Sequence, residues 1–179
     1  MEPLLLVLDL DETLVYATET PMPNPPDFRF SAYYIYWRPH LDSFLAQILS
    51  LYRVAIWTAS GAAYADEVIN AILPDRSALA FMWSREKCTK AYDFDLQTHY
   101  FIKDLKKVFR QGYRKERVVI VDDSPEKVKR QYGNHIRLSE WKGDPTDTEL
   151  LLLPSYLAIL NGAENVRLVE KRSWKSKVS

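Results

Sequence analysis

Four short apolar segments recur along the chain and predict buried β-strands. They comprise residues 4–9, 53–57, 78–82 and 117–121. Each is short, nearly continuous in apolar residues, and contains β-branched or aromatic side chains in places. Runs of this kind are typical of parallel strands that are covered on both faces of a sheet.

Two segments between these strands have the spacing of amphipathic helices. Apolar residues recur three and four positions apart in residues 40–50 and again in residues 62–73. Strands and helices therefore alternate along the chain, which favours right-handed crossover connections. The pattern predicts an α/β fold, a three-layer α/β/α sandwich with a central parallel sheet.

Two further segments interrupt this alternation. Residues 16–37 are rich in proline and end in alternating aromatic residues, which predicts a β-hairpin or flap. Residues 83–104 mix charged and aromatic residues and predict a second small β insertion. Neither insertion leaves room for an additional domain, so we expect small β-hairpin insertions and no large cap domain.

Length and composition indicate one globular unit. The chain has 179 residues, of which 47% are hydrophobic, and this suits a single domain over residues 1–165. Residues 166–179 form a basic C-terminal tail that we expect to fray. The N-terminal apolar run is too short for a membrane span and lacks the features of a signal peptide. A single cysteine, Cys88, excludes an internal disulfide, and we expect a cytoplasmic location.

The formal net charge of the chain is zero. A neutral chain has no general electrostatic attraction for DNA or RNA, so nucleic acid is not the expected partner. No membrane partner is expected either, and the oligomeric state is open.

The first candidate site follows the first predicted strand in the sequence DLDETL. Asp9 and Asp11 lie at the carboxyl end of a parallel strand, where ligands bind in open α/β sheets. Alternation along the chain places both side chains on one side, where they repel unless a cation lies between them or one is protonated. This favours a divalent metal or a nucleophile and acid pair. A turn in which an aspartate caps a helix is the alternative.

A second acid pair, Asp122 and Asp123, follows the strand at residues 117–121. Ser124 and Pro125 then have the pattern of a helix start, so Asp123 or Ser124 acting only as a cap is the alternative. Two strands that each end in two acids are better explained by a Mg²⁺ ion at that edge of the sheet.

Two other polar residues follow strand-like segments. Thr58 ends the segment VAIWT ahead of a helix, where a hydroxyl and free N–H groups suit an anion, although a plain helix cap fits equally well. Lys103 follows the stretch YFI and can neutralise phosphate charge at the same edge, although a solvated lysine is the alternative. The order of acid pair, hydroxyl, lysine and acid pair predicts a Mg²⁺ and phosphate site.

These motifs resemble, in order, those of the haloacid dehalogenase superfamily of phosphohydrolases. DLDETL resembles the first motif DxDx(T/V), IWTAS the threonine/serine motif, Lys103 the lysine motif, and VDDS the acidic fourth motif. The sequence is most similar to the NLI-interacting-factor family, which includes small phosphatases of the RNA polymerase II carboxy-terminal domain. The segments YWRPHLDSFL, SREKC and DTELLLLP also resemble that family.

The resemblance implies a catalytic role for both aspartates of the first motif. Asp9 would attack phosphorus and form an aspartyl-phosphate, and Asp11 would protonate the leaving oxygen and then activate water. Mg²⁺ would be bound by the Asp9 carboxylate, the Asp11 backbone carbonyl and Asp123. Asp122 would support the metal shell or Lys103, and which of Asp122 and Asp123 ligates the metal directly is open.

The resemblance also implies a set of residues that contact the substrate. Thr58 and Lys103 would bind the transferring phosphoryl oxygens, and Arg85 would contact the substrate phosphate. Tyr64 would line the substrate groove, and Thr13 is a further candidate substrate-binding residue.

An open site without a cap favours a phosphate carried on a large partner. We therefore predict a Mg²⁺-dependent phosphatase acting on phosphoserine or phosphothreonine of a protein or peptide, with a nuclear location possible if the organism is a eukaryote. Residues 16–37 either border the substrate groove or cover the edge of the sheet. The alternatives are a phosphatase of nucleic-acid ends or small phosphomonoesters, and a catalytically idle module that binds phosphopeptides or partner proteins.

Overall fold

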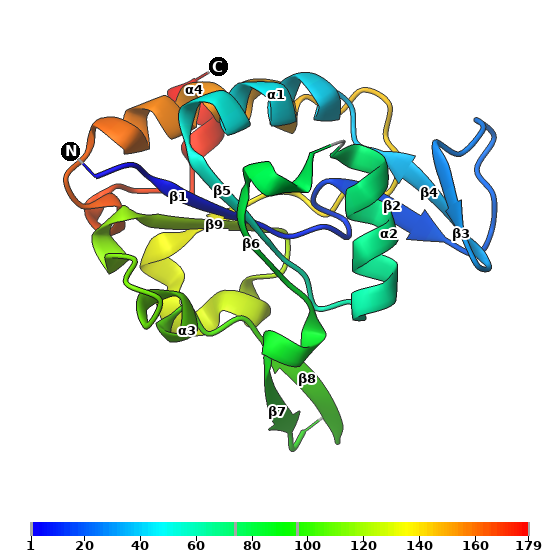
Figure 1. Cartoon of the computed structure of the whole chain (residues 1–179), viewed down its shortest axis with the longest axis horizontal. Helices are drawn as coiled ribbons and strands as arrows, with labels where there is room; N and C mark the ends of the chain where they lie inside the picture. Colours follow the sequence, from blue (N-terminus) through cyan, green and yellow to red (C-terminus); the bar gives the residue numbers. More distant parts are fainter. Residues whose placement is uncertain (1, 74, 96, 179) are drawn as a thin grey trace.

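A computed structural model describes residues 2–73, 75–95 and 97–178. Its centre is a five-stranded parallel sheet with the strand order β10-β9-β1-β5-β6 (Figure 1). All four predicted strands are confirmed, and β10 is an additional edge strand that the apolar pattern did not predict. The strands are β1 Leu5–Leu8, β5 Arg53–Trp57, β6 Leu79–Trp83, β9 Val118–Asp122 and β10 His135–Arg137.

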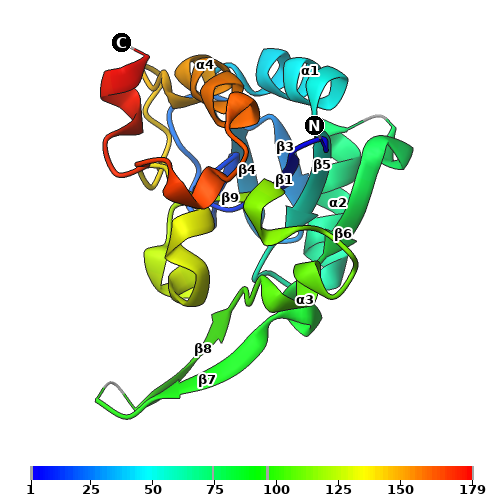
Figure 2. The ribbon, with the colours of Figure 1, turned by 90° about the vertical axis from the view of Figure 1, so that its left-hand side faces the viewer.

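Helices cover both faces of this sheet. The two predicted helices are confirmed as α1, Leu41–Leu51, and α2, Ala62–Ile72. A third long helix, α4, Glu149–Gly162, lies beside α1, whereas the short α3, Lys106–Phe109, lies on the opposite face (Figures 1 and 2). The described residues also form 3-10 helices at Arg76–Ala78, Arg85–Lys87, Lys115–Arg117, Pro125–Asn134, Val166–Leu168 and Trp174–Lys177.

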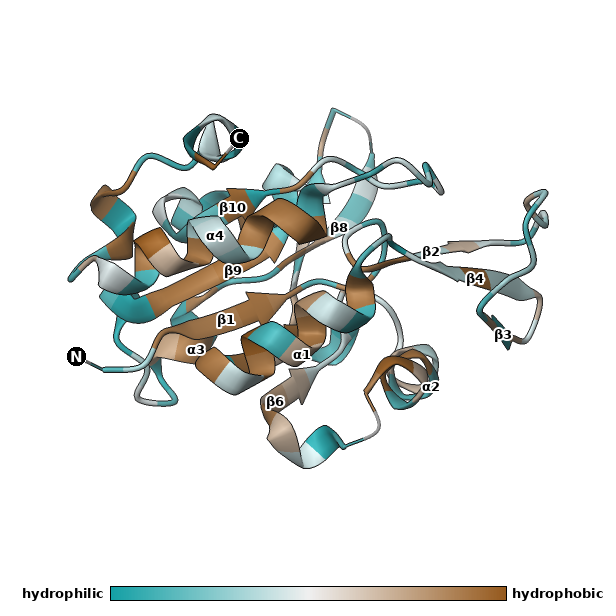
Figure 3. Cartoon of the chain, turned by 90° about the horizontal axis from the view of Figure 1, so that it is seen from above, coloured by the Kyte–Doolittle hydropathy of each residue, from teal (hydrophilic) through white to brown (hydrophobic). Residues whose placement is uncertain are grey.

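Both faces of the strands are apolar because alternate side chains enter two different cores. Leu4, Leu6 and Leu8 pack with α1, α2 and α4, whereas Leu5 and Val7 pack against α3 on the other face. The central strand β1 is accordingly hydrophobic along its whole length, and β9 is hydrophobic up to its last residue, Asp122 (Figure 3). The predicted three-layer α/β/α sandwich is confirmed.

The two insertions form small antiparallel sheets. Residues 16–37 contribute to a three-stranded sheet with the order β2-β4-β3, formed by β2 Val15–Thr18, β3 Phe28–Phe30 and β4 Tyr33–Trp37. The second insertion is a hairpin of β7 Thr89–Asp93 and β8 Thr98–Ile102, which projects from the body of the molecule (Figures 1 and 2).

The prediction that the C-terminal tail frays is wrong for its described residues. The side chains of Val166 and Trp174 are buried in the main core. The Trp174 indole packs near Tyr156, with ring centroids 5.9 Å apart, and its Nε1 donates to the carbonyl of Arg137 at 3.0 Å. A single large aromatic side chain therefore anchors a segment whose composition is otherwise basic and polar.

Among the described residues, no helix is both long enough and apolar enough to cross a bilayer.

Candidate active site

The carboxyl ends of the central strands bring three sequence motifs together. In the sheet, Leu8 of β1 is in register with Ile56 of β5 and with Val121 of β9. The residues that follow these positions therefore meet at one edge of the sheet. A pocket of about 410 Å³ lies there, and its lining includes Asp9, Asp11, Thr58 and Tyr64.

Three buried carboxylates at this edge can hold a cation. Oxygens of Asp9, Asp122 and Asp123 lie within 4.8 Å of one another. Oδ2 of Asp9 is buried and has no hydrogen-bond partner in the structure. Burial, reinforced by the charge of Asp122, raises the pKa of Asp9 to about 7, and burial also raises the pKa of Asp123. An unpaired buried oxygen beside two other carboxylates suits a hard divalent cation, so these residues fit Mg²⁺.

Lys103 is fully buried between two of these acids. Its Nζ lies 2.7 Å from Oδ1 of Asp9 and 2.6 Å from Oδ2 of Asp122. Burial by itself would lower the pKa of Lys103, but the charges of Asp122 and Asp9 outweigh it and raise the pKa. Lys103 is therefore a charged residue of the site, and the alternative of a solvated surface lysine is wrong.

Asp11 is held on a different wall of the pocket. Its carboxylate accepts hydrogen bonds from Ser60 Oγ at 2.6 Å and from the hydroxyl of Tyr64 at 2.6 Å. Burial and the nearby charge of Asp11 raise the pKa of Tyr64, so this hydroxyl stays protonated and donates. The Asp11 side chain is not one of the three clustered carboxylates. The two acids of the first motif thus have separate surroundings.

Thr58 and Arg85 also lie at the pocket. Thr58 is fully buried, and its hydroxyl accepts from the Ser60 amide at 3.0 Å. Helix α2 begins at Ala62 with Gly61 as its N-cap, so Thr58 is not the cap of that helix. Arg85 donates from Nε to the carbonyl of Ala59 at 2.7 Å, and its guanidinium lies 5.3 Å from the ring centre of Phe101.

Thr13 contacts the candidate metal site and does not line the pocket. Its side chain is fully buried and is not part of the pocket lining. The hydroxyl instead donates to Oδ1 of Asp123 at 3.3 Å. The structure therefore does not support the expected substrate contact, and Thr13 orients a carboxylate of the candidate metal site.

Two charged residues of the pocket were missed by the sequence analysis. Lys127 lines the pocket and has its Nζ 3.9 Å from Oδ2 of Asp9. Glu12 also lines it, and burial together with the charge of Asp11 raises the pKa of Glu12 to about 7. Lys127 could have been found from the sequence, because it lies in the first turn of the helix that follows the second acid pair.

Residues 16–37 border the pocket, as one of the two alternatives predicted. Phe30 and Tyr33 from this segment line it together with Tyr64. The ring of Tyr64 meets those of Phe30 and Tyr33 edge-on, with centroids 5.7 and 6.4 Å away. The pocket is therefore lined by aromatic side chains as well as by acidic and cationic ones.

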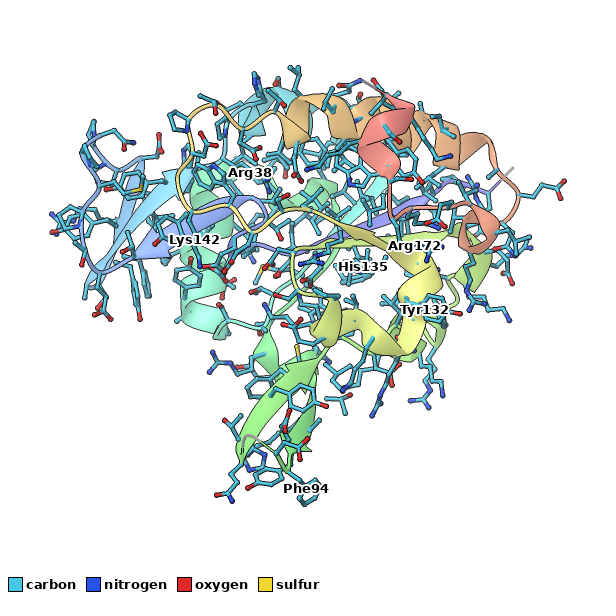
Figure 4. All side chains as sticks on the ribbon, turned by 180° about the vertical axis from the view of Figure 1, so that it is seen from behind. Arg38, Phe94, Tyr132, His135, Lys142 and Arg172 are labelled. Carbon is cyan, nitrogen blue, oxygen red and sulfur yellow. The ribbon has the colours of Figure 1, made fainter. Side chains whose placement is uncertain are left out.

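A buried arginine forms a hydrogen bond to the backbone of the loop that carries the first motif. The fully buried Arg38 (Figure 4) forms two hydrogen bonds to the Asp147 carboxylate, from Nε at 2.8 Å and from a terminal nitrogen at 2.7 Å. Its other terminal nitrogen donates to the carbonyl of Thr13 at 3.0 Å. Because Thr13 belongs to the same loop as Asp9 and Asp11, this arginine stabilises the loop that carries both candidate catalytic aspartates.

The fold and this site define a haloacid dehalogenase-like protein. A solved structure of the fission yeast RNA polymerase II CTD phosphatase Fcp1, bound to beryllium fluoride, has the same fold with a TM-score of 0.60. The match covers 98% of this chain and 49% of that chain at 20% sequence identity. It confirms the fold that the motifs implied.

The chain belongs to the NLI interacting factor-like phosphatase family, whose model matches residues 4–167. Nuclear envelope morphology protein 1 of Schizosaccharomyces pombe is 33% identical over 90% of this chain and 34% of its own length. CTD nuclear envelope phosphatase 1 of Xenopus tropicalis is 33% identical over 94% of this chain and 71% of its own length. The chain thus spans about a third of the fission yeast relative.

Proposed function

We propose that this protein is a Mg²⁺-dependent phosphatase that hydrolyses phosphomonoesters through an aspartyl-phosphate on Asp9. The observation that carries the proposal is the position of the Asp9 carboxylate. It lies at the pocket floor, with one oxygen 2.7 Å from the Lys103 ammonium and the other without a hydrogen-bond partner.

In the first step, a carboxylate oxygen of Asp9 attacks phosphorus in line with the leaving oxygen, and the bond between phosphorus and that oxygen breaks. Asp11 gives its proton to the leaving oxygen. In the second step, Asp11 takes a proton from water as the water attacks the phosphoryl group, which releases phosphate and restores the Asp9 carboxylate. The Ser60 and Tyr64 hydroxyls keep the Asp11 carboxyl in place for both transfers.

Positive charge in the pocket offsets the charge of the phosphoryl group. Lys103 is fixed between Asp9 and Asp122, Lys127 lies on the other side of Asp9, and Arg85 stands at the pocket wall. Fixed charges of this kind need little reorganisation during the reaction. Mg²⁺ held by Asp9, Asp122 and Asp123 would supply further positive charge to the phosphoryl oxygens.

We propose phosphoserine or phosphothreonine in a protein as the substrate. The pocket is bordered by Phe30, Tyr33 and Tyr64, which provide an apolar surface beside the reacting group. Neither insertion of the described chain forms a domain over the pocket, so a residue carried on a large partner has access. Two of the relatives are named CTD small phosphatase-like protein 3 and CTD nuclear envelope phosphatase 1, and from these names we propose a nuclear location.

Removal of Mg²⁺ is expected to reduce phosphate release from p-nitrophenyl phosphate by about 100-fold or more. A metal contributes several kcal/mol to such a transition state, and each 1.4 kcal/mol corresponds to a factor of about ten. The measurement compares kcat/KM of protein treated with EDTA before and after Mg²⁺ is restored. Full activity in EDTA, with metal content checked by mass spectrometry, would contradict the proposed cofactor.

A phosphoserine peptide is expected to be hydrolysed with a kcat/KM at least about tenfold higher than a 3′-phosphorylated oligonucleotide. The chain has no net positive charge, so it has no general attraction for the further phosphates of an oligonucleotide. Steady-state phosphate release from both substrates at the same salt concentration gives the ratio. Preference for the oligonucleotide would favour the nucleic-acid alternative, and turnover of neither substrate nor p-nitrophenyl phosphate would favour an idle binding module.

A further inference from the structure

A second pocket lies beside the edge strand β10, away from the active site. It has a volume of about 530 Å³ and is formed by parts of residues 125–137 and 167–172. Tyr132, His135 and Arg172 lie near one another on this side of the molecule (Figure 4). None of its lining residues lines the active-site pocket, so a ligand bound here leaves that pocket open. We call it the β10 pocket.

The β10 pocket concentrates positive charge on a chain that is neutral as a whole. Its lining contains the exposed residues Arg137, Arg167 and Arg172 and the buried Lys171. The lining contains one acid, Glu170, and its carboxylate already forms an ion pair with Arg172 at 2.6 Å. The local excess of cations favours an anionic ligand.

Lys171 adds a separate indication of an anion. The residue is only 7% exposed, and its Nζ donates to two neutral backbone carbonyls, that of Val169 at 2.8 Å and that of Val166. Burial lowers the pKa of Lys171 to about 8. Among the described residues, no carboxylate lies within ion-pair distance of Lys171, and the charge of Glu170 offsets the effect of burial only in part. Buried charges in proteins are normally paired, so an anion in the pocket would compensate this ammonium group.

The pocket also presents apolar surface to solvent. Tyr132 is 82% exposed and Leu168 is 84% exposed, and both side chains line the pocket. These two side chains offer apolar surface beside the charged residues of the pocket, and a ligand in the pocket can cover it. The ligand therefore carries apolar groups as well as negative charge.

We propose that the β10 pocket binds an acidic segment of a partner protein in which carboxylates flank an aliphatic or aromatic side chain. The carboxylates meet the arginines and Lys171, and the apolar side chain packs between Tyr132 and Leu168. A nucleic-acid strand carries phosphates but no aliphatic side chain to pack against Leu168. A flat bilayer surface would not reach Lys171, which is recessed in the pocket.

The test measures binding of a fluorescein-labelled peptide that alternates glutamate and leucine, by fluorescence anisotropy with the full chain. The combined variant Arg137→Gln, Arg167→Gln and Arg172→Gln is expected to bind about tenfold more weakly or worse, because each exposed ion pair contributes a factor of roughly two to five. The matched control carries Arg110→Gln, Arg114→Gln and Lys115→Gln. It removes the same charge from exposed residues outside the pocket and is expected to bind like the unchanged protein.

Two further binding measurements test the apolar and the charged contacts separately. Leu168→Ser keeps every charge and is expected to weaken binding several-fold, whereas replacing the glutamates of the peptide by glutamine is expected to abolish it. The proposal is overturned by equal weakening in both arginine variants, by binding that ignores the glutamates, or by unchanged binding of Leu168→Ser. It is also overturned if phosphatidylserine vesicles or single-stranded RNA bind more tightly than the peptide at the same salt concentration.

Discussion

Asp9→Asn is expected to lower kcat for phosphate release by about 10⁵-fold or more. The change removes the nucleophilic oxygen while keeping the size of the side chain, and loss of a nucleophile in covalent catalysis has effects of this order. Lys103 keeps its ion pair with Asp122 at 2.6 Å in this variant, so the buried ammonium group remains paired. Steady-state rates with a phosphoserine peptide and with p-nitrophenyl phosphate measure the loss.

Asp42→Asn is the matched control for this variant. Asp42 is an exposed residue in the first turn of α1 and is not part of the pocket lining, so its amide variant is expected to retain full activity. If the Asp9→Asn protein were folded, as judged by circular dichroism, and kept more than about a tenth of the activity, Asp9 would not be the nucleophile.

Arg38→Met is expected to destabilise the fold by about 3–5 kcal/mol, which is the usual cost of removing one partner of a buried ion pair. The guanidinium is fully buried, and its loss removes two hydrogen bonds from the Asp147 carboxylate and one from the Thr13 carbonyl. The loop that carries Asp9 and Asp11 is expected to loosen with it. Urea unfolding followed by tryptophan fluorescence gives the change in free energy of unfolding.

Arg172→Met provides the comparison for Arg38→Met. Its side chain is 91% exposed although it also pairs with a carboxylate, that of Glu170. An ion pair exposed to solvent contributes little to stability, so this variant is expected to unfold close to the original midpoint. Equal destabilisation by the two variants would show that burial of the Arg38 ion pair is not what stabilises the loop.

The central sheet could be predicted because its strands are apolar on both faces. Leu5 and Val7 enter one core, and Leu4, Leu6 and Leu8 the other, so the sequence is continuously hydrophobic. The edge strand β10 was missed because only Ile136 of its three residues is buried and apolar. The tail was misjudged because Val166 and Trp174 are buried in the main core although the residues around them are basic and polar.

Some residues of the candidate site could also be predicted from the sequence, and others could not. Asp9, Asp122 and Asp123 could be predicted to meet because each directly ends or follows a parallel strand, and the ends of such strands share one edge. Thr13 could not be placed correctly, since its contact with Asp123 joins residues 110 positions apart. Such a contact depends on tertiary packing and leaves no pattern in the local sequence.

The contact between Arg38 and Asp147 could not be predicted from the local sequence either. The two residues are 109 positions apart, and each belongs to a segment that resembles the family without revealing its partner. Lys127 reaches the site because the acidic loop turns directly into a 3-10 helix at Pro125. The sequence alone predicted a helix start there but not which of its side chains turns back toward Asp9.

Chemical trapping of the phosphorylated enzyme tests the central claim most directly. An acyl phosphate is reduced by borohydride to an alcohol, so protein quenched during turnover of a phosphoserine peptide and then reduced is predicted to carry homoserine at position 9. Peptide mass spectrometry locates the modified residue, with Asp9→Asn and unreacted protein as controls. Homoserine at a different aspartate, or turnover without any at position 9, would contradict the aspartyl-phosphate mechanism.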